Sequence, residues 1–221
     1  HWGGGRGDRR NQTELNMRIA VFASGRGSNM VALAEAARDG QLPGVSIGLV
    51  VCDRPGAPVL DHAQRLGLSS FALDPSDCEN KRAYESEILL QLELHRIDLA
   101  VLAGYMRIAG PTLLEVWQGR MINLHPSLLP DFPGKDGIGD AFRAGVSETG
   151  VTVHFVDAGV DTGPIIAQRT VKLGPNESLH SLEERIHRVE HQLLPETIRC
   201  LAEKKINKVF LETAEQTTAN Q

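Results

Sequence analysis

Short apolar runs alternate with amphipathic stretches along this chain, and the two patterns predict different elements. Compact apolar runs bounded by Gly, Pro, Asp or Ser indicate strands, and they cover Arg18–Ala23, Ser46–Val51, Ser70–Leu73, Leu99–Leu102, Met121–Leu124, Val151–Val156 and Ile165–Val171. Stretches with apolar residues three or four positions apart indicate helices, and they cover Met30–Arg38, Val59–Leu66, Lys81–His95 and Leu182–Lys204. Pro195 interrupts the last stretch, so a kink or break is expected near Leu194.

Strands that alternate with helices predict an α/β fold: a single-domain, doubly wound, mostly parallel, Rossmann-like sheet with helices on both faces. The domain is expected over residues 17–205. A disordered leader or tag at 1–16 should precede it, and a C-terminal segment at 206–221 with a frayed end should follow it. Ligands bind such sheets beyond the carboxyl ends of the strands. Three predicted strands end at residues 24–29, at 104–108 and at His125, so these ends should line one crevice.

The Gly-rich turn at residues 24–29 joins the first predicted strand to the first predicted helix. Backbone N–H groups at a helix N-terminus favour an anion, and glycines allow a phosphate to approach closely. Ser28 or Asn29 is expected to cap this helix. The turn is neither a Walker A loop nor a full dinucleotide fingerprint. It therefore predicts a phosphate site, with an ordinary strand-to-helix turn as the alternative.

Asn123, His125 and Asp161 are the candidate catalytic residues. Positions two apart in an extended segment point to the same side, so Asn123 and His125 can aim an amide and an imidazole at one point. Both groups can donate to a developing oxyanion, and Asp161 could hold the imidazole and accept or relay a proton. No Ser lies in a nucleophile-elbow context and no Cys–His pair is evident, so the nucleophile is expected to belong to the substrate. The alternative is that the Asn and His only satisfy buried backbone groups.

Weaker signals surround these residues. The 104–108 segment offers an apolar slot with one cation, and the turn-rich loop at 157–164 could present backbone groups to a flat heterocycle. His154 alternates with apolar residues in a strand, which is compatible with a core histidine or with a support role. His187 and His191 are expected to be exposed on their helix. No histidine has a companion carboxylate at a recognised metal spacing, so no metal is predicted.

Charge and cysteine content restrict the partners and the compartment. The formal net charge of −5 argues against a broad nucleic-acid footprint. No apolar run approaches the ~20 residues that cross a bilayer, and the N-terminus lacks a signal-peptide core. The three cysteines are scattered, which favours a reducing cytoplasm. Small-molecule substrates, with no nucleic acid and no membrane, are therefore expected.

Several motifs together resemble the folate-dependent formyltransferases. They are residues 23–29, residues 102–108, the Asn-x-His-Pro-Ser-Leu-Leu-Pro segment at 123–130, and Asp-Thr-Gly-Pro at 161–164. The resemblance covers roughly residues 17–204. It implies transfer of the formyl group of 10-formyltetrahydrofolate, as co-substrate, to the amine of glycinamide ribonucleotide in purine biosynthesis, without a metal.

The same resemblance implies a role for each matching residue. Asn123 and His125 would stabilise the oxyanion, and Asp161 would orient and charge His125. The remaining matches are a phosphate site at Gly27, Ser28 and Asn29, further substrate contacts at Arg82 and Glu190, and a folate pocket at Met106, Arg107, Ile108, Ala158, Gly159 and Val160.

Residues 135–140 depart from relatives that carry histidines after Pro133-Gly134, and two glycines within three residues suggest a mobile loop there. Alternatives within the family are methionyl-tRNA formyltransferase and formyltetrahydrofolate deformylase. The first needs a longer C-terminal region, and the second needs an N-terminal regulatory domain. A non-catalytic folate-binding module is the alternative of a different class. A monomer or a homodimer fits equally well.

Overall fold

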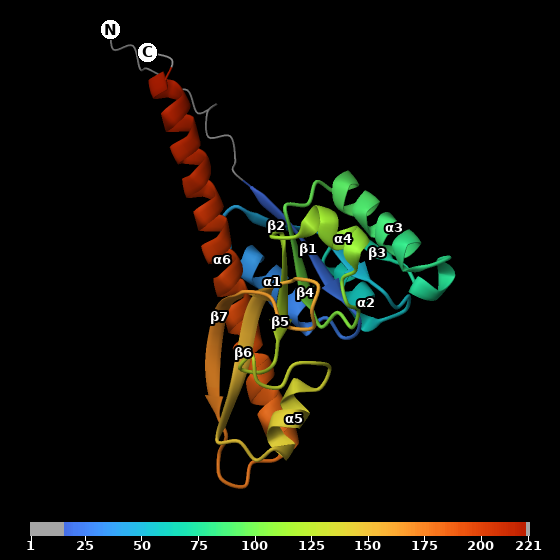
Figure 1. The fold of residues 1–221 in the computed structure, drawn as a ribbon, viewed down its shortest axis with the longest axis vertical. Coiled ribbons are helices and arrows are strands. Elements are labelled where there is room, and N and C mark those ends of the chain that lie inside the picture. Colours follow the sequence, from blue (N-terminus) through green and yellow to red (C-terminus); the bar gives the residue numbers. More distant parts are fainter. Residues whose placement is uncertain (1–15, 220–221) are drawn as a thin grey trace.

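The computed structural model describes residues 16–219, so the leader predicted at 1–16 lies almost wholly outside the described residues. One seven-stranded sheet forms the centre of the fold (Figure 1). Its strands are β1 (Met17–Ala23), β2 (Val45–Cys52), β3 (Ser70–Ala72), β4 (Leu99–Ala103), β5 (Met121–His125), β6 (Glu148–Phe155) and β7 (Ile165–Lys172). The helices are α1 (Ser28–Arg38), α2 (Pro58–Arg65), α3 (Lys81–Leu94), α4 (Pro111–Trp117), α5 (Gly137–Arg143) and α6 (Leu179–Ala219). All seven predicted strands are present.

The strands lie in the order β3-β2-β1-β4-β5-β6-β7. The first five strands in this order, β3, β2, β1, β4 and β5, are parallel. Helical connections return the chain to the end of the sheet at which each of these strands begins. β6 is antiparallel to both β5 and β7. A loop without a helix joins β6 to β7, and such a connection can only reverse the chain. The sheet is therefore mostly parallel, as the sequence predicts.

Alternate residues of the central strands enter two separate cores. In β1, Ile19 and Val21 pack on one face with α1, α2 and α6, whereas Ala20 and Phe22 pack on the other face with α3 and α4. In Figure 1, α6 and α1 lie to one side of the sheet, and α3 and α4 to the other. Burial on both faces explains why β1 reads as a continuous apolar run, as parallel strands usually do.

The break expected near Leu194 is wrong, because α6 continues through Pro195. Proline removes one backbone donor from the helix. Leu193, Leu194 and Ile198 lie in the buried core against the sheet, so packing holds the backbone on both sides of the proline. α6 also reaches Ala219, through most of the segment where a frayed end is expected. None of the helices in the described part of the chain is long and apolar enough to cross a membrane.

The pattern missed two helices, α4 and α5, each of seven residues. α5 replaces part of the mobile loop predicted after Pro133-Gly134. The Asp136 side chain caps it by accepting the Gly139 N–H at 3.2 Å. The two glycines serve close packing rather than mobility. A Cβ at Gly137 would lie 3.0 Å from His125 Nε2, and one at Gly139 would collide with the Asp136 carboxylate.

Candidate active site

The carboxyl ends of β1, β4 and β5 open into a cavity of about 1040 Å³. All three strand ends singled out from the sequence line it, and α5 and the first turns of α6 complete the walls. The position follows from the strand order. The chain continues from β1 to β2 on one side and returns to β4 on the other, so the connections diverge where β1 meets β4.

The Gly-rich turn places the open N-terminus of α1 at this cavity. The capping residue is Gly27 in a left-handed conformation (φ 73°), and no side chain caps the helix, which corrects the expected Ser28 or Asn29 cap. Uncapped N–H groups of a first helical turn are free to bind an anion. Asn29 is buried instead, and its Nδ2 lies 3.5 Å from Glu190 Oε2 on α6. Its Oδ1 has no hydrogen-bond partner in the described structure.

We expect Gly27→Ala to destabilise the fold, whereas Gly25→Ala in the same turn should have little effect on it. A Cβ at Gly27 would collide with the Val59 side chain, and its positive φ disfavours any other residue. A Cβ at Gly25 meets nothing within 4 Å. Strain of this kind costs about 1–3 kcal/mol. Urea unfolding of both variants measures the difference, and equal free energies of unfolding would show that Gly27 is not required by the backbone.

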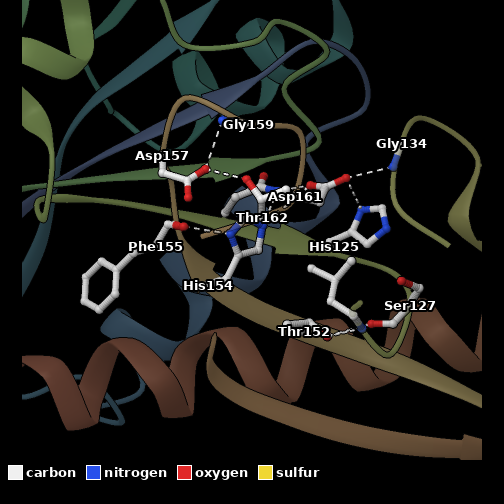
Figure 2. A network of polar contacts seen from close by, with 12 residues as sticks. His125, Ser127, Gly134, Thr152, His154, Phe155, Asp157, Gly159, Asp161 and Thr162 are labelled. Atoms are coloured by element: carbon white, nitrogen blue, oxygen red, sulfur yellow. Dashed lines mark hydrogen bonds and ion pairs between the residues drawn. The ribbon is translucent and has the colours of Figure 1, made fainter. Parts of the chain in front are cut away.

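Asn123, His125 and Asp161 all line the cavity and come together there. Figure 2 shows the His125 ring beside the Asp161 carboxylate. The pleat of β5 points Asn123 and His125 to the same side. Asn123 Nδ2 donates to Asp161 Oδ1 at 3.2 Å, and His125 Nδ1 lies 3.5 Å from Asp161 Oδ2. The sequence could not show whether Asp161 lies near Asn123 and His125. In the structure it contacts both. One carboxylate contacts both candidate donors.

The loop after β5 holds His125 from the other side. His125 Nε2 lies 2.8 Å from the backbone oxygen of Phe132, and since a carbonyl oxygen can only accept, Nε2 carries a proton. Buried Ser127 and Thr152 fix this loop, because Thr152 Oγ1 donates to Ser127 O at 2.7 Å. The His125 side chain is only 5% exposed. The contacts with Phe132 and Asp161 together hold the ring in one orientation in this structure.

His154 lies opposite Asn123 on the neighbouring strand β6. Its Nδ1 is 2.8 Å from Phe155 O and its Nε2 is 3.1 Å from Asn123 Nδ2. A protonated ring pairs through Nε2 with Asp161 Oδ1, 3.5 Å away. The carbonyl can only accept and the amide nitrogen can only donate, so the neutral ring carries its proton on Nδ1. His154 thus accepts one N–H of Asn123 while Asp161 accepts the other. This geometry supports the predicted support role.

Asp161 is held in its charged form. Burial by itself raises the pKa of this carboxyl, but contacts with His154, the Gly134 N–H and His125 outweigh burial and leave the pKa below its ordinary value. The Gly134 N–H donates to Oδ2 at 2.8 Å. Asp161 also has a left-handed backbone (φ 53°), which is uncommon for a residue with a side chain. The loop that carries it must maintain that conformation.

An apolar rim surrounds this polar base. Met106, Ile108 and Val160 expose 44%, 53% and 47% of their surface, large fractions for apolar side chains, and all three line the cavity. Arg107 supplies a cation beside them, and its Nε donates to the buried Asp53 carboxylate at 2.9 Å. A flat apolar ligand that bears carboxylates fits such a rim, as the 104–108 segment predicts.

α6 contributes residues that sequence reasoning missed. His187 and His191 both line the cavity. His187 is exposed, as expected, whereas His191 is half-buried. His187 Nδ1 lies 2.6 Å from Glu190 Oε1, and this contact raises the pKa of His187. Burial lowers the pKa of His191, which is partly buried. The i, i+3 spacing of His187 and Glu190 was the sequence signal that could have identified this pair. Only the docking of α6 against α1 directs the two side chains into the cavity.

Two predicted contacts lie elsewhere. Arg82 is exposed in the first turn of α3 and does not line the cavity. Ala158 lines a second, smaller hollow beside α4. The other predicted site residues line the main cavity: Gly27, Ser28, Asn29, Met106, Arg107, Ile108, Asn123, His125, His154, Gly159, Val160, Asp161 and Glu190.

Fold and site together define a doubly wound α/β protein in which one cavity contains an uncapped helix N-terminus and a cluster of Asn, Asp and His side chains. The formyl transferase family model matches residues 17–198. The chain belongs to the formyl transferase family.

Relatives within the family are similar over most of the chain. The chain is 48% identical over 184 residues to phosphoribosylglycinamide formyltransferase of Bacillus subtilis (strain 168), covering 83% of this chain and 94% of the relative. It resembles the crystal structure of glycinamide ribonucleotide transformylase 1 from Geobacillus kaustophilus with a TM-score of 0.82 and 56% identity, over 85% of this chain and 99% of that one. It is 41% identical over 190 residues to the trifunctional purine biosynthetic protein adenosine-3 of Drosophila melanogaster, covering 86% of this chain and 14% of that protein.

Proposed function

We propose that this enzyme transfers the formyl group of 10-formyltetrahydrofolate to the amine of 5'-phosphoribosylglycinamide, in the de novo biosynthesis of purines. The observation that carries the proposal is the Asn123–Asp161–His125 cluster at the base of a cavity that also contains a helix N-terminus and an apolar rim. The 48% identity to the Bacillus subtilis enzyme, over nearly its whole length, supports the choice of acceptor.

The cavity has separate regions that suit the two substrates. The N-terminus of α1 suits the phosphate of the ribonucleotide, with Gly27, Ser28 and Asn29 around it and Glu190 beside it. The apolar rim at Met106, Ile108 and Val160 suits the pterin and benzoyl portions of the folate. The formyl group would then lie over Asn123 and His125, between the two regions.

The transfer requires no nucleophile from the protein. The substrate amine attacks the formyl carbon, a C–N bond forms, and the carbonyl π electrons move to oxygen. The amide of Asn123 and the imidazole of His125 stabilise that oxyanion. When the oxyanion collapses, the bond to folate N10 breaks, and the proton lost by the amine passes to N10 with Asp161 assisting. The products are the formylated glycinamide ribonucleotide and tetrahydrofolate.

The contacts of the cluster favour this direct route. Among the described residues, Asn123, His125 and Asp161 contact one another, His154 and backbone groups, and none contacts a Ser hydroxyl or a Cys thiol. In substrate complexes, catalytic hydrogen bonds commonly tighten or change partner. One N–H of Asn123 and one of His125 would therefore turn from their present acceptors to the oxyanion.

A turnover assay with three acceptors tests the proposal. Purified enzyme, without added metal, is mixed with 10-formyltetrahydrofolate and either glycinamide ribonucleotide, initiator Met-tRNA or water alone. We expect tetrahydrofolate to form only with glycinamide ribonucleotide. Formation of tetrahydrofolate with water alone would identify a formyltetrahydrofolate deformylase. Formation that depends on the initiator Met-tRNA would identify a methionyl-tRNA formyltransferase. Folate binding without turnover on any acceptor would indicate a binding module. A cytoplasmic location and a monomeric or homodimeric state remain predictions of the same proposal.

A further inference from the structure

The loop between β6 and β7 carries Asp161, yet its own backbone is weakly tied to the rest of the fold. Residues 157–163 make no backbone–backbone hydrogen bond in the described structure; the nearest such bonds are those of Phe155 and Val156. The loop also borders two hollows. One is the active-site cavity, and the other is a hollow of about 510 Å³ between the loop and α4. Core packing therefore does not fix the position of Asp161.

Side-chain contacts within the loop supply the missing ties (Figure 2). The Asp157 Oδ1 oxygen accepts the Thr162 hydroxyl at 2.6 Å and the Gly159 N–H at 3.0 Å. The bond from Thr162 spans the turn, and the bond from Gly159 ties its middle to the same oxygen. Gly159 is required for the arrangement, because a Cβ there would collide with Thr162 Oγ1. The same two bonds, with that from Thr162 the stronger, hold the pKa of Asp157 below its ordinary value.

Asp161 lies directly before Thr162 in this turn and has the left-handed backbone. Its carboxylate extends across the cavity to Asn123, His125 and the Gly134 N–H. A hydrogen bond that fixes Thr162 therefore limits how far the Asp161 backbone can rotate. Without it, the turn can relax toward an ordinary negative φ and withdraw the carboxylate from its partners.

We propose that Asp157 and Thr162 are positioning residues that hold Asp161 against Asn123 and His125. The inference rests on the proposed function, because it assigns to this pair a part in the same transfer. The pair is largely exposed, so it should add little to global stability. Its effect should therefore appear in catalysis and not in unfolding.

Paired substitutions at Thr162 test the proposal. Thr162→Val removes the hydroxyl but keeps the shape and charge, whereas Thr162→Ser keeps the donor. We expect Thr162→Val to lower kcat about 10-fold, since a displacement of about 1 Å at a catalytic group can cost up to about 100-fold. Thr162→Ser should stay within about twofold of the native chain, because it retains the hydrogen bond. Asp157→Ala should behave like Thr162→Val, and Asp157→Asn, which keeps an accepting oxygen, like Thr162→Ser.

The pH dependence separates positioning from a general loss of order. His125 and His154 face the Asp161 carboxylate from β5 and β6, and the Gly134 N–H faces it from the loop after β5. These contacts depress the pKa of Asp161, so a displaced Asp161 titrates at higher pH. The acid limb of the kcat profile should therefore move to higher pH in Thr162→Val. That variant is the cleaner one, since removing the Asp157 charge would by itself move the pKa of Asp161 downward.

The matched control is Ser76→Ala. Ser76 donates its hydroxyl at 2.8 Å and its N–H at 2.9 Å to Asp74 Oδ1, in a similar exposed turn outside the cavity. It should leave both kcat and the acid limb unchanged. The proposal is overturned if Thr162→Val matches the native chain, if Thr162→Ser is equally impaired, or if only the KM for folate rises while the acid limb stays in place.

A readout without substrate keeps this inference separate from the proposed function. Carbon-13 NMR of labelled aspartates follows the titration of Asp161, which is assigned by its absence in Asp161→Asn. A higher pKa of Asp161 in Thr162→Val, reversed in Thr162→Ser, supports positioning even if glycinamide ribonucleotide is not the acceptor. An unchanged pKa of Asp161 overturns it even if the transfer assay succeeds.

Discussion

Asn123→Ala is expected to lower kcat for formyl transfer by at least about 100-fold, the scale for losing one oxyanion donor. The amide of Asn123 is held by two acceptors, Asp161 Oδ1 and His154 Nε2, and one of its N–H groups would turn to the oxyanion as it forms. An Ala side chain can make neither contact. Because an oxyanion is present only after attack on the carbonyl, the loss should appear mainly in kcat and much less in KM.

Asn80→Ala is the matched control for that measurement. Asn80 also uses its side-chain amide, whose Oδ1 accepts the Ala83 N–H at 2.8 Å to cap α3 outside the cavity. Its loss should cost about 1 kcal/mol of stability and leave kcat unchanged. Steady-state kinetics and urea unfolding of both variants separate the two effects. A near-normal kcat in Asn123→Ala would remove this amide from the mechanism.

The second large effect is expected at His125. His125→Ala should lower kcat by at least about 100-fold, because one ring both donates to the oxyanion and takes part in proton movement. The imidazole contacts Asp161 on one side and the Phe132 oxygen on the other. Gly137 packs so closely that a Cβ there would lie 3.0 Å from Nε2. A substitution that keeps volume, His125→Gln, should restore packing without restoring the rate.

His62→Ala provides the control for His125. His62 lies on α2, where its Nδ1 is 2.7 Å from Arg65 Nη2 in an exposed contact outside the cavity. Its removal should change neither kcat nor the shape of the pH profile. Rapid-quench measurement of a single turnover distinguishes chemistry from product release. If His125→Gln forms product in a single turnover as fast as the native chain, the imidazole does not act in the chemical step.

Local patterns predicted the elements well where burial repeats at a regular period. The β1 run is apolar on both faces because two cores use its alternate residues, and that signal is present in the sequence itself. The helices α4 and α5 were missed because seven residues are too few to show a helical period. The break predicted at Pro195 failed for a different reason. The low helix propensity of proline describes an isolated helix, whereas α6 is buried against the sheet on both sides of Pro195.

Gly137 and Gly139 also show that a local sequence rule can be overridden by tertiary packing. Two glycines close together predict mobility from backbone entropy alone. In the fold they permit α5 to approach His125 and the Asp136 cap. No local rule distinguishes a glycine that loosens a loop from one that allows two segments to touch, because the second segment lies elsewhere in the chain.

What the sequence by itself determined is the set of residues that share one strand or one turn. Asn123 and His125 must face the same side because the side-chain period of a strand is two, and the Gly-rich turn must join the first strand to the first helix. Only the tertiary structure decided which distant groups meet them. Asp161 reaches Asn123 and His125 through a left-handed turn in the β6–β7 loop, and Glu190 and His187 reach the cavity through the docking of α6. Those contacts depend on strand order and on the path of loops, which a periodic pattern does not encode.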